Sequence, residues 1–373
     1  MEYTKMHEDA LYASWQFDTV NEDFSNVLAF LNNDFRSFGD GLKEFLALRP
    51  VDGICNPIKH LKALCVQADV NIADIASQNT LKDWFNGNKR PKKGETERKK
   101  MFAFAFALKL TPEETKNLFH KVYLDRAFNK RNYKELIYYH CLDKGYKFAY
   151  AEKLIERVAL EKTSATDQTL YTAVLSAETE MIQNTDDLLT YIQNHQHNYS
   201  LNNLSAKEEL LHQKELALGR AQKEAEEDSD LKIYSGRDTS SDSFLYYVIT
   251  GQSVAGKAGT VTLSFKNSTL PKDIKNNFPQ SGSFSDKVDS YEELRKSIVL
   301  LFSYWYWRKA QIQKETDYYD DYIDELNNVL EKAGLSPLYY GNPYDWMFLY
   351  CTNADRPLDT FRGLLADVLD QQE

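Results

Sequence analysis

The chain has 373 residues and a formal net charge of −11, and it is 42% hydrophobic and 13% aromatic. This length suggests two or three domains, and the aromatic content excludes a largely disordered chain. With 15 Gly and 9 Pro, the composition also excludes a collagen-like, low-complexity or turn-rich all-β protein, and no apolar run approaches the roughly 18 residues of a membrane span.

The four cysteines are expected to be free thiols of a cytoplasmic protein. Cys55, Cys65, Cys141 and Cys351 lie far apart without any C-x-x-C spacing, so neither a zinc ribbon nor a disulfide framework is indicated. Residues 1–17 lack the basic start and the apolar core of a signal peptide. Free thiols fit the reducing cytoplasm, and no membrane contact is expected.

Residues 1–55 are predicted to form an N-terminal helical segment. Their apolar residues recur at helical spacing, which places them on one face of a helix: Phe24, Val27, Leu28, Leu31 and Phe35. The stretch Arg49-Pro50-Val51-Asp52-Gly53 then predicts a turn that interrupts the helical pattern, because Pro and Gly are typical of turns.

Residues 56–131 are predicted to form a row of short helices. Asn56 followed by Pro57 is a favourable start, because Asn caps free amide groups and Pro suits the first helical turn. Three further helices are expected over 71–76, 80–85 and 97–108. Thr111 and Pro112 open a fifth helix, with Thr as the cap and acids following it.

A basic segment stands out from the acidic chain. Residues 81–131 contain 14 Lys or Arg and 6 Asp or Glu, a net charge of +8, which leaves −19 for the remainder. Such a cluster is typical of contact with a polyanion. The alternative is a solvated helical face that carries lysines.

Several motifs within 58–123 occur together in one kind of DNA-binding domain. They are Ile72-Ala73-Asp74-Ile75-Ala76, Thr80-Leu81-Lys82-Asp83-Trp84-Phe85, Asn86-Gly87, Arg90-Pro91 and the alanine-rich stretch 102–110. With them the segment resembles the N-terminal helix-turn-helix of xenobiotic-response-element-type (Cro/C1-like) regulators. The resemblance implies five short helices, of which the third contacts bases in the major groove.

The resemblance also implies which side chains contact DNA. On the third helix they are the polar residues at its N-terminal end, Ser77, Gln78, Asn79, Thr80 and Lys82. In the following loop they are four phosphate contacts, Lys89, Arg90, Lys92 and Lys93. Leu81, Trp84 and Phe85 would attach the helix to the core. A homodimer on double-stranded DNA is expected, because paired half-sites raise specificity.

One feature departs from the pattern of these regulators. Only Ser77, Gln78 and Asn79 separate Ala76 from the predicted third helix at Thr80, where such domains usually have several more residues. The alternative to DNA contact is that the shortened turn points the third helix away from DNA. The segment would then be a structural helical bundle, with Trp84 and Phe85 only in its core.

The rest of the chain is expected to be helical as well. Residues 132–230 are predicted as a helical middle region that ends in a charged linker helix, with a domain boundary within 205–242. Residues 231–373 are predicted as a C-terminal helical domain. Within it, residues 244–270 are ambiguous between helix and strand and leave open a small β-hairpin near 244–266.

Two patterns in the C-terminal part invite a functional interpretation. Gly251 to Lys257 fits G-x-x-x-x-G-K, but Ala258 stands where a P-loop needs a hydroxyl, so a turn or hairpin is the preferred interpretation. The aromatic cluster 302–309 could stack bases or hold a partner; a helix buried on most sides is the simpler interpretation. No metal, cofactor or catalytic constellation is expected.

We therefore expect a mostly α, non-catalytic, DNA-binding regulatory protein. Motifs at 126–129, 135–139 and 342–346 are similar to those of bacterial proteins that combine such an N-terminal domain with an uncharacterised helical C-terminal region. The alternative is a protein-interaction module of a bacterial defence or mobile-element system, whose bundle does not bind DNA and whose acidic, aromatic C-terminal region holds a protein partner.

Overall fold

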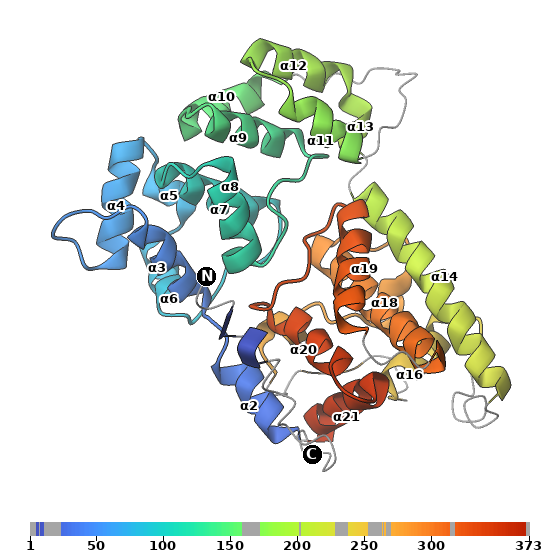
Figure 1. Cartoon of the computed structure of the whole chain (residues 1–373). Helices are drawn as coiled ribbons and strands as arrows, with labels where there is room; N and C mark the ends of the chain where they lie inside the picture. The colour runs from blue at the N-terminus through green and yellow to red at the C-terminus, as the bar shows by residue number, and fades with distance from the viewer. Residues whose placement is uncertain are drawn as a thin grey trace. The chain divides into compact units, whose positions relative to one another are not determined.

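The structure is a computed structural model, and it describes residues 5–6, 8–10, 24–158, 172–200, 203–227, 238–252, 263, 265, 270–313 and 318–370. Throughout these residues the regular secondary structure is helical and no strand occurs (Figure 1), which confirms the mostly-α fold. None of the described helices is long and apolar enough to cross a membrane. The chain forms two compact units: unit 1 contains residues 1–35 and 204–373, and unit 2 contains residues 36–203.

The two units divide the chain differently from the four segments expected from the sequence. Residues 1–55 are not one segment, because α2 (Ser25–Asn33) belongs to unit 1 and α3 (Phe38–Ala47) to unit 2. The apolar face predicted for α2 is buried as expected, but it packs into the same core as the C-terminal helices. Residues 56–131 share unit 2 with the helices over 132–203.

The charged helix expected to be a linker is instead a core element of unit 1. α14 (Leu204–Glu227) lies along α18 (Tyr291–Gln313) (Figure 1). Much of its buried face consists of alanines, namely Ala206, Ala217, Ala221 and Ala225. The distance between packed helices depends on the side chains at the contact, so these small residues allow a close approach. The linker prediction was wrong because alanines contribute little to a hydrophobic pattern.

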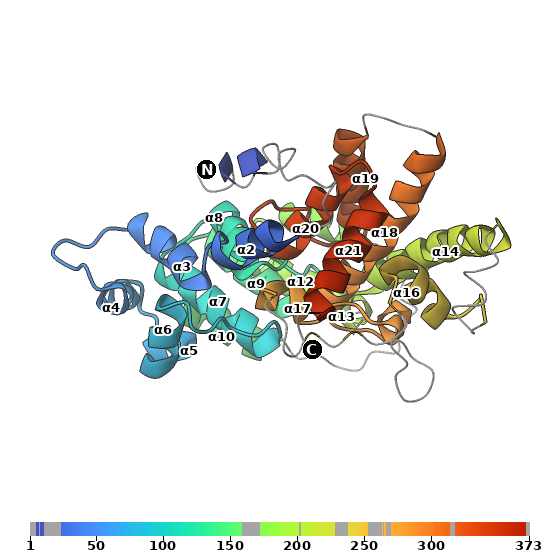
Figure 2. The ribbon, with the colours of Figure 1, turned by 90° about the horizontal axis from the view of Figure 1, so that it is seen from below.

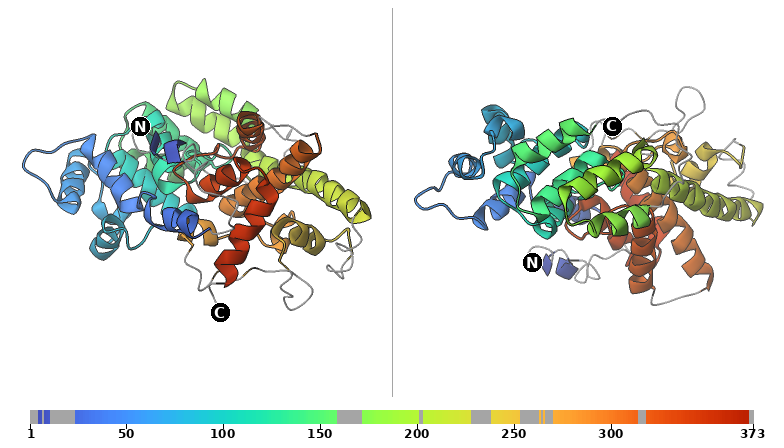
Figure 3. Two further views of the ribbon diagram at one scale, coloured as in Figure 1. Left: turned by 60° about the horizontal axis from the view of Figure 1, so that its bottom comes forward. Right: turned by 90° about the horizontal axis from the view of Figure 1, so that it is seen from above.

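Besides α2, the other helices of unit 1 pack on α18 or on one another. They are α16 (Asp242–Thr250), α17 (Lys272–Lys275), the 3-10 helix η5 (Ser281–Phe284), α19 (Tyr319–Lys332), α20 (Pro343–Thr352) and α21 (Pro357–Asp370). Of these, η5, α19, α20 and α21 contact α18 directly (Figure 3). α18 is buried along most of its length, so the aromatic cluster 302–309 forms core, with only Trp305 half-buried among its large rings.

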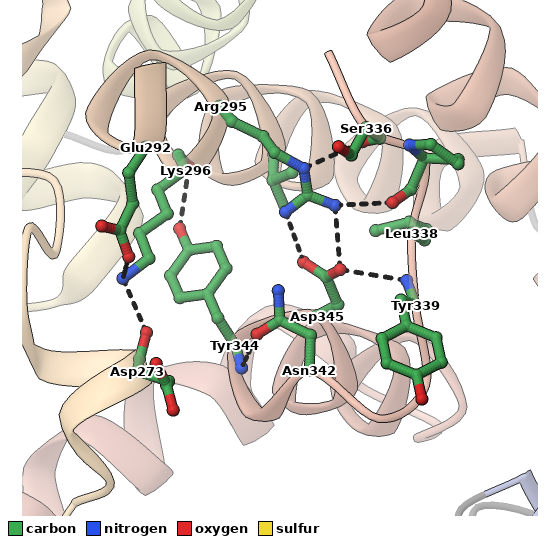
Figure 4. Close-up of polar contacts among 12 residues, drawn as sticks. Asp273, Glu292, Arg295, Lys296, Ser336, Leu338, Tyr339, Asn342, Tyr344 and Asp345 are labelled. Atoms are coloured by element: carbon green, nitrogen blue, oxygen red, sulfur yellow. Dashed lines mark hydrogen bonds and ion pairs between the residues drawn. The ribbon is translucent and has the colours of Figure 1, made fainter. Parts of the chain in front are cut away.

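A buried ion pair joins α18 to α20 in unit 1. Arg295 donates through Nη1 and Nη2 to the two carboxylate oxygens of Asp345, at 2.7 and 2.8 Å (Figure 4). The backbone amide of Tyr339 also donates to Asp345, and Arg295 donates to the carbonyl oxygens of Ser336 and Pro337. A bidentate pair of this kind fixes the relative orientation of its two groups and also stabilises their contact. It therefore holds the loop before α20 against α18.

The possible hairpin near 244–266 is a helix in its first part. Phe244, Leu245, Tyr246, Val248 and Ile249 are buried residues of α16. Ser241 caps the helix by accepting a hydrogen bond from the amide of Phe244. A helix that is apolar all round is typical of full burial, and tertiary packing here overrides the strand preference of these residues. The remaining hairpin residues fall mostly outside the described residues.

Unit 2 is a second helical bundle. After α3 it contains α4 (Pro57–Ala68), α5 (Ile72–Ile75), α6 (Gln78–Phe85), α7 (Glu95–Ala107), α8 (Pro112–Leu118), the π-helix η3 (Phe119–Tyr123), α9 (Tyr133–Asp143), α10 (Phe148–Arg157), α11 (Thr172–Glu180), α12 (Thr185–Asn194) and α13 (Gln196–Ser200). The predicted caps are confirmed: Asn56 caps α4 with Pro57 in its first turn, and Thr111 forms a capping box on α8.

The ionic centre of unit 2 is Arg98 on α7. Its guanidinium forms two hydrogen bonds of 2.7 Å with Glu135 on α9 and one of 2.8 Å with Asp125. It also donates to the carbonyl oxygens of Arg126 and Ala127. All three charged side chains are buried, so Arg98 ties the chain after η3 to two helices of the bundle.

Candidate nucleic-acid interface

The helix α6 shows its polar N-terminal end to solvent. Ser77 caps it, accepting a hydrogen bond of 3.3 Å from the amide of Thr80, and the two hydroxyls lie 2.9 Å apart. Ser77, Gln78, Asn79 and Lys82 are exposed, and Thr80 is half-buried. The residues predicted to contact bases therefore lie at the surface of unit 2.

The opposite face of α6 is buried, as predicted. Leu81, Trp84 and Phe85 belong to the core of unit 2, and the ring of Phe38 meets Trp84 edge-on with centroids 5.6 Å apart. Gly39 of α3 permits the close approach, since a Cβ atom there would lie 2.3 Å from the carbonyl oxygen of Trp84. α3, α4 and α6 pack on one another, while α5 packs on α7 (Figure 2).

The turn before α6 is shorter than the sequence predicted. α5 ends at Ile75 and α6 begins at Gln78, so only Ala76 and Ser77 lie between them. Ala76 is fully extended, with φ −170° and ψ 162°. The helix starts two residues earlier than expected because Ser77 provides its cap.

The lysines in the loop after α6 differ in their contacts. Lys89 pairs with Asp83 of α6, with Nζ 2.7 Å from Oδ2. Lys92 is exposed and has no ion pair with any residue that the structure describes, while its carbonyl oxygen accepts a hydrogen bond of 2.6 Å from the hydroxyl of Tyr123. Burial raises the pKa of Tyr123, so this hydroxyl stays protonated as a donor. Lys93 is half-buried.

Arg90 does not have the role predicted for it. Its guanidinium turns inward, donates to the carbonyl oxygens of Val122 and Tyr123 at 3.3 and 2.9 Å, and lies 6.0 Å from the ring centroid of Phe38. These carbonyls are at the end of η3, where Leu124 takes a left-handed conformation and stops the helix, leaving the last acceptors for other donors. Arg90 thus fastens the loop to the bundle and is not a phosphate contact in this arrangement.

Part of the basic segment pairs with charges from elsewhere in unit 2. Three acids from outside 81–131 pair with its cations: Glu135 with Arg98, Glu152 with Lys99, and Glu180 with Lys130. Two cations from outside pair in turn with its acids: Arg49 with Glu114 and Lys134 with Glu95. The sequence count of +8 still overstates the positive charge at the surface, because Arg98 is buried. Lys82 on α6 and Lys92 in the loop after it are exposed lysines for which no ion pair forms within the described part of the chain.

Other candidate chemistry finds little support. No group of three or more His, Cys, Asp or Glu that could hold a metal ion occurs among the described residues. In the G-x-x-x-x-G-K pattern, Gly251 ends α16 in a left-handed conformation, and residues 253–257 lie outside the described residues. A P-loop follows a strand, whereas this pattern follows a helix.

No family model matches the chain, and no match is found among curated proteins or solved structures.

Proposed function

We propose that the chain is a non-catalytic regulatory protein that binds double-stranded DNA through α6. The exposed row formed by Ser77, Gln78, Asn79 and Lys82 carries this proposal, because it lies on the N-terminal half of a short helix whose opposite face is buried. Helix-turn-helix proteins place the same part of their recognition helix against base edges. Amide and hydroxyl groups there can donate and accept hydrogen bonds.

Phosphate contacts would come from fewer side chains than the sequence indicated. Lys82 on α6 and Lys92 in the following loop are exposed and supply positive charge, and Lys89 can join them by leaving Asp83. With so few contacts, nonspecific affinity should be modest, because each phosphate contact adds to the salt-dependent part of binding. A homodimer would double the contacts and fits the expectation for a short recognition helix.

The test measures the affinity of the full chain for a labelled random-sequence duplex of about 30 base pairs, roughly three helical turns. Binding is monitored by fluorescence anisotropy at several salt concentrations. Lys82→Glu should weaken binding strongly. Lys153→Glu is the matched control, because Lys153 is an exposed lysine of α10. Equal affinities of wild type and Lys82→Glu would contradict the proposal.

The second candidate is a protein-interaction module, in the setting of a bacterial defence or mobile-element system. The pairing of Lys99 with Glu152 and of Lys130 with Glu180 favours it, since these acids compete with a polyanion for cations of the basic segment. Under this hypothesis the chain would not bind the duplex even at low salt, and Lys82→Glu would not change this result.

A further inference from the structure

A groove of about 430 Å³ runs between α14 and α18 in unit 1. The two helices lie side by side (Figures 1 and 3). Ion pairs from Lys207 to Asp289 and from Arg308 to Glu224 show that they run in the same direction. The groove lies between residues 215–223 and residues 305–313, about two helical turns or 12 Å on each side.

The groove has apolar walls that remain open to solvent. They are formed by Leu216, Gly219, Trp305 and Ile312. Ile312 is 54% exposed, although it is a large aliphatic side chain. At Gly219 an added Cβ atom would meet no heavy atom within 4 Å, so the helix surface there is uncovered. Such an arrangement leaves apolar area that a ligand could remove from water.

The charged side chains that line the groove are mainly cationic: Arg220, Lys223 and Lys309 against the single carboxylate of Glu215. Lys223 is exposed, and no ion pair holds it within the described residues. Arg220 lies 3.1 Å from a carboxylate oxygen of Glu224 that Arg308 also contacts, at 2.6 Å, so one carboxylate serves two guanidinium groups. Lys309 lies over the ring of Trp305, with Nζ 5.3 Å from its centroid, and it also pairs with Glu325 at 3.7 Å. This positive rim contrasts with the chain's net charge of −11.

We propose that this groove binds an acidic amphipathic helix of a partner protein. The apolar face of that helix would cover Trp305 and Ile312, and its carboxylates would meet Arg220 and Lys223. Grooves of this kind take apolar residues at positions i, i+3 or i+4 and i+7 of a helix, and two turns of groove match that spacing. Charge complementarity at the rim sets which partner enters and speeds its association.

A nucleotide fits these side chains less well. Its phosphates could use the cations and its base could stack on Trp305, but nothing in it would cover the exposed aliphatic surface of Ile312 and Leu216. The groove is separate from α6, since it lies in unit 1 and α6 in unit 2. The inference therefore goes beyond DNA binding and stands or falls independently of it.

The experiment is a display selection with a random library of peptides of roughly 16 residues, long enough to form a helix on the protein, against the full chain. The blocking variant is Gly219→Phe, which places a ring into the groove and replaces a poor helix former. Leu211→Phe is its control, because Leu211 is an exposed residue of the same helix that does not line the groove. Lys223→Glu tests the charge, with the exposed Lys287→Glu as its control.

The enriched peptides should be acidic, with apolar residues three and four apart. Their affinity should fall by at least about tenfold for Gly219→Phe and for Lys223→Glu, and it should stay unchanged for both controls. If Gly219→Phe fails to fold by circular dichroism, Lys223→Glu carries the test. Three outcomes would overturn the proposal: no enriched peptide, peptides without acidic bias or insensitive to these variants, or quenching of Trp305 by ATP or GTP that Lys223→Glu abolishes.

Discussion

Lys89 and Asp83 form an ion pair across the turn that ends α6, with Nζ 2.7 Å from Oδ2. The lysine side chain is 70% exposed and the carboxylate 33% exposed. Surface pairs of this kind stabilise a fold by only about 0–1 kcal/mol. Lys89 can therefore exchange Asp83 for a DNA phosphate at little cost, which makes Asp83 an internal competitor of the proposed ligand.

The first prediction is that Asp83→Asn raises DNA affinity. The substitution frees Lys89 and removes a negative charge from the surface of α6. We expect affinity for the random-sequence duplex to increase about two- to fivefold, as the loss of a surface pair implies. The dependence of log Kd on log salt should steepen by about 0.9 if Lys89 gains one phosphate. Both are measured by anisotropy titration.

Asp69→Asn is the matched control for this change. Asp69 is also exposed and pairs with a lysine, Lys147, at 3.0 Å, but it ends α4 instead of lying on α6. Asn tolerates its left-handed conformation. An equal gain of affinity in both variants would show that net charge alone matters, and it would remove the assigned role of Lys89.

The second prediction concerns the glycine that positions α6. Gly39→Ala places a Cβ atom against the backbone of Trp84 and Phe85, and backbone cannot move aside as a flexible side chain can. We expect a loss of about 1–3 kcal/mol in the free energy of unfolding, measured by urea denaturation, together with weaker DNA binding. Gly94→Ala is the control, because a Cβ atom there meets nothing within 4 Å; similar losses in both would contradict the packing argument.

The sequence predicted those features of the site that depend on neighbours along the chain. Hydroxyl and amide caps act over two or three residues, so Asn56 and Thr111 marked helix starts correctly. The apolar stripe of α6 follows from helical periodicity, and the polar N-terminal residues are exposed for the same reason. These patterns are sufficient to find a short amphipathic helix.

Features that depend on distant residues could not be predicted in this way. Arg90 donates hydrogen bonds to carbonyl oxygens at the end of η3, 32 and 33 residues away. Nothing in the sequence next to Arg90 distinguishes it from a surface arginine. The positive count of the basic segment included Arg98, which is buried against Glu135. A charge count treats every cation as exposed, so it overstated the positive surface.

The third prediction is that Arg98 is essential to the stability of unit 2. Arg98→Met leaves Glu135 and Asp125 buried without their partner, and breaking a buried pair typically costs about 3–5 kcal/mol. Hydrogen exchange of residues 95–107 should speed up accordingly. Lys99→Met is the control, because Lys99 is a neighbouring residue whose pair with Glu152 lies near the surface; we expect a change within about 1 kcal/mol. Equal protection in both variants would contradict a structural role for the Arg98 network.

The fourth prediction is that one thiol of four reacts rapidly. Cys55 is exposed, whereas Cys65, Cys141 and Cys351 are buried. Burial raises the pKa of Cys65 to about 11 and that of Cys141 to about 12, and the thiolate is the reactive form. Titration with a disulfide reagent at pH 8 should show one fast thiol, which Cys55→Ser removes, and four after denaturation. A fast phase that survives Cys55→Ser would mean that a second cysteine opens to solvent.

The last prediction is that unit 2 loses stability in mild acid through His140. Burial lowers the pKa of this imidazole below 6.5, and Lys144 lowers it further while Asp143 opposes the shift. The unfolded chain therefore binds the proton more readily, so the free energy of unfolding falls as pH drops below about 6.5. One group can contribute at most about 1.4 kcal/mol per pH unit. Urea unfolding at pH 7.5 and 5.5 measures this loss, which His140→Gln should reduce. His212→Gln, at an exposed position of α14, should retain the wild-type loss. If His140→Gln also retains it, the acid sensitivity arises elsewhere.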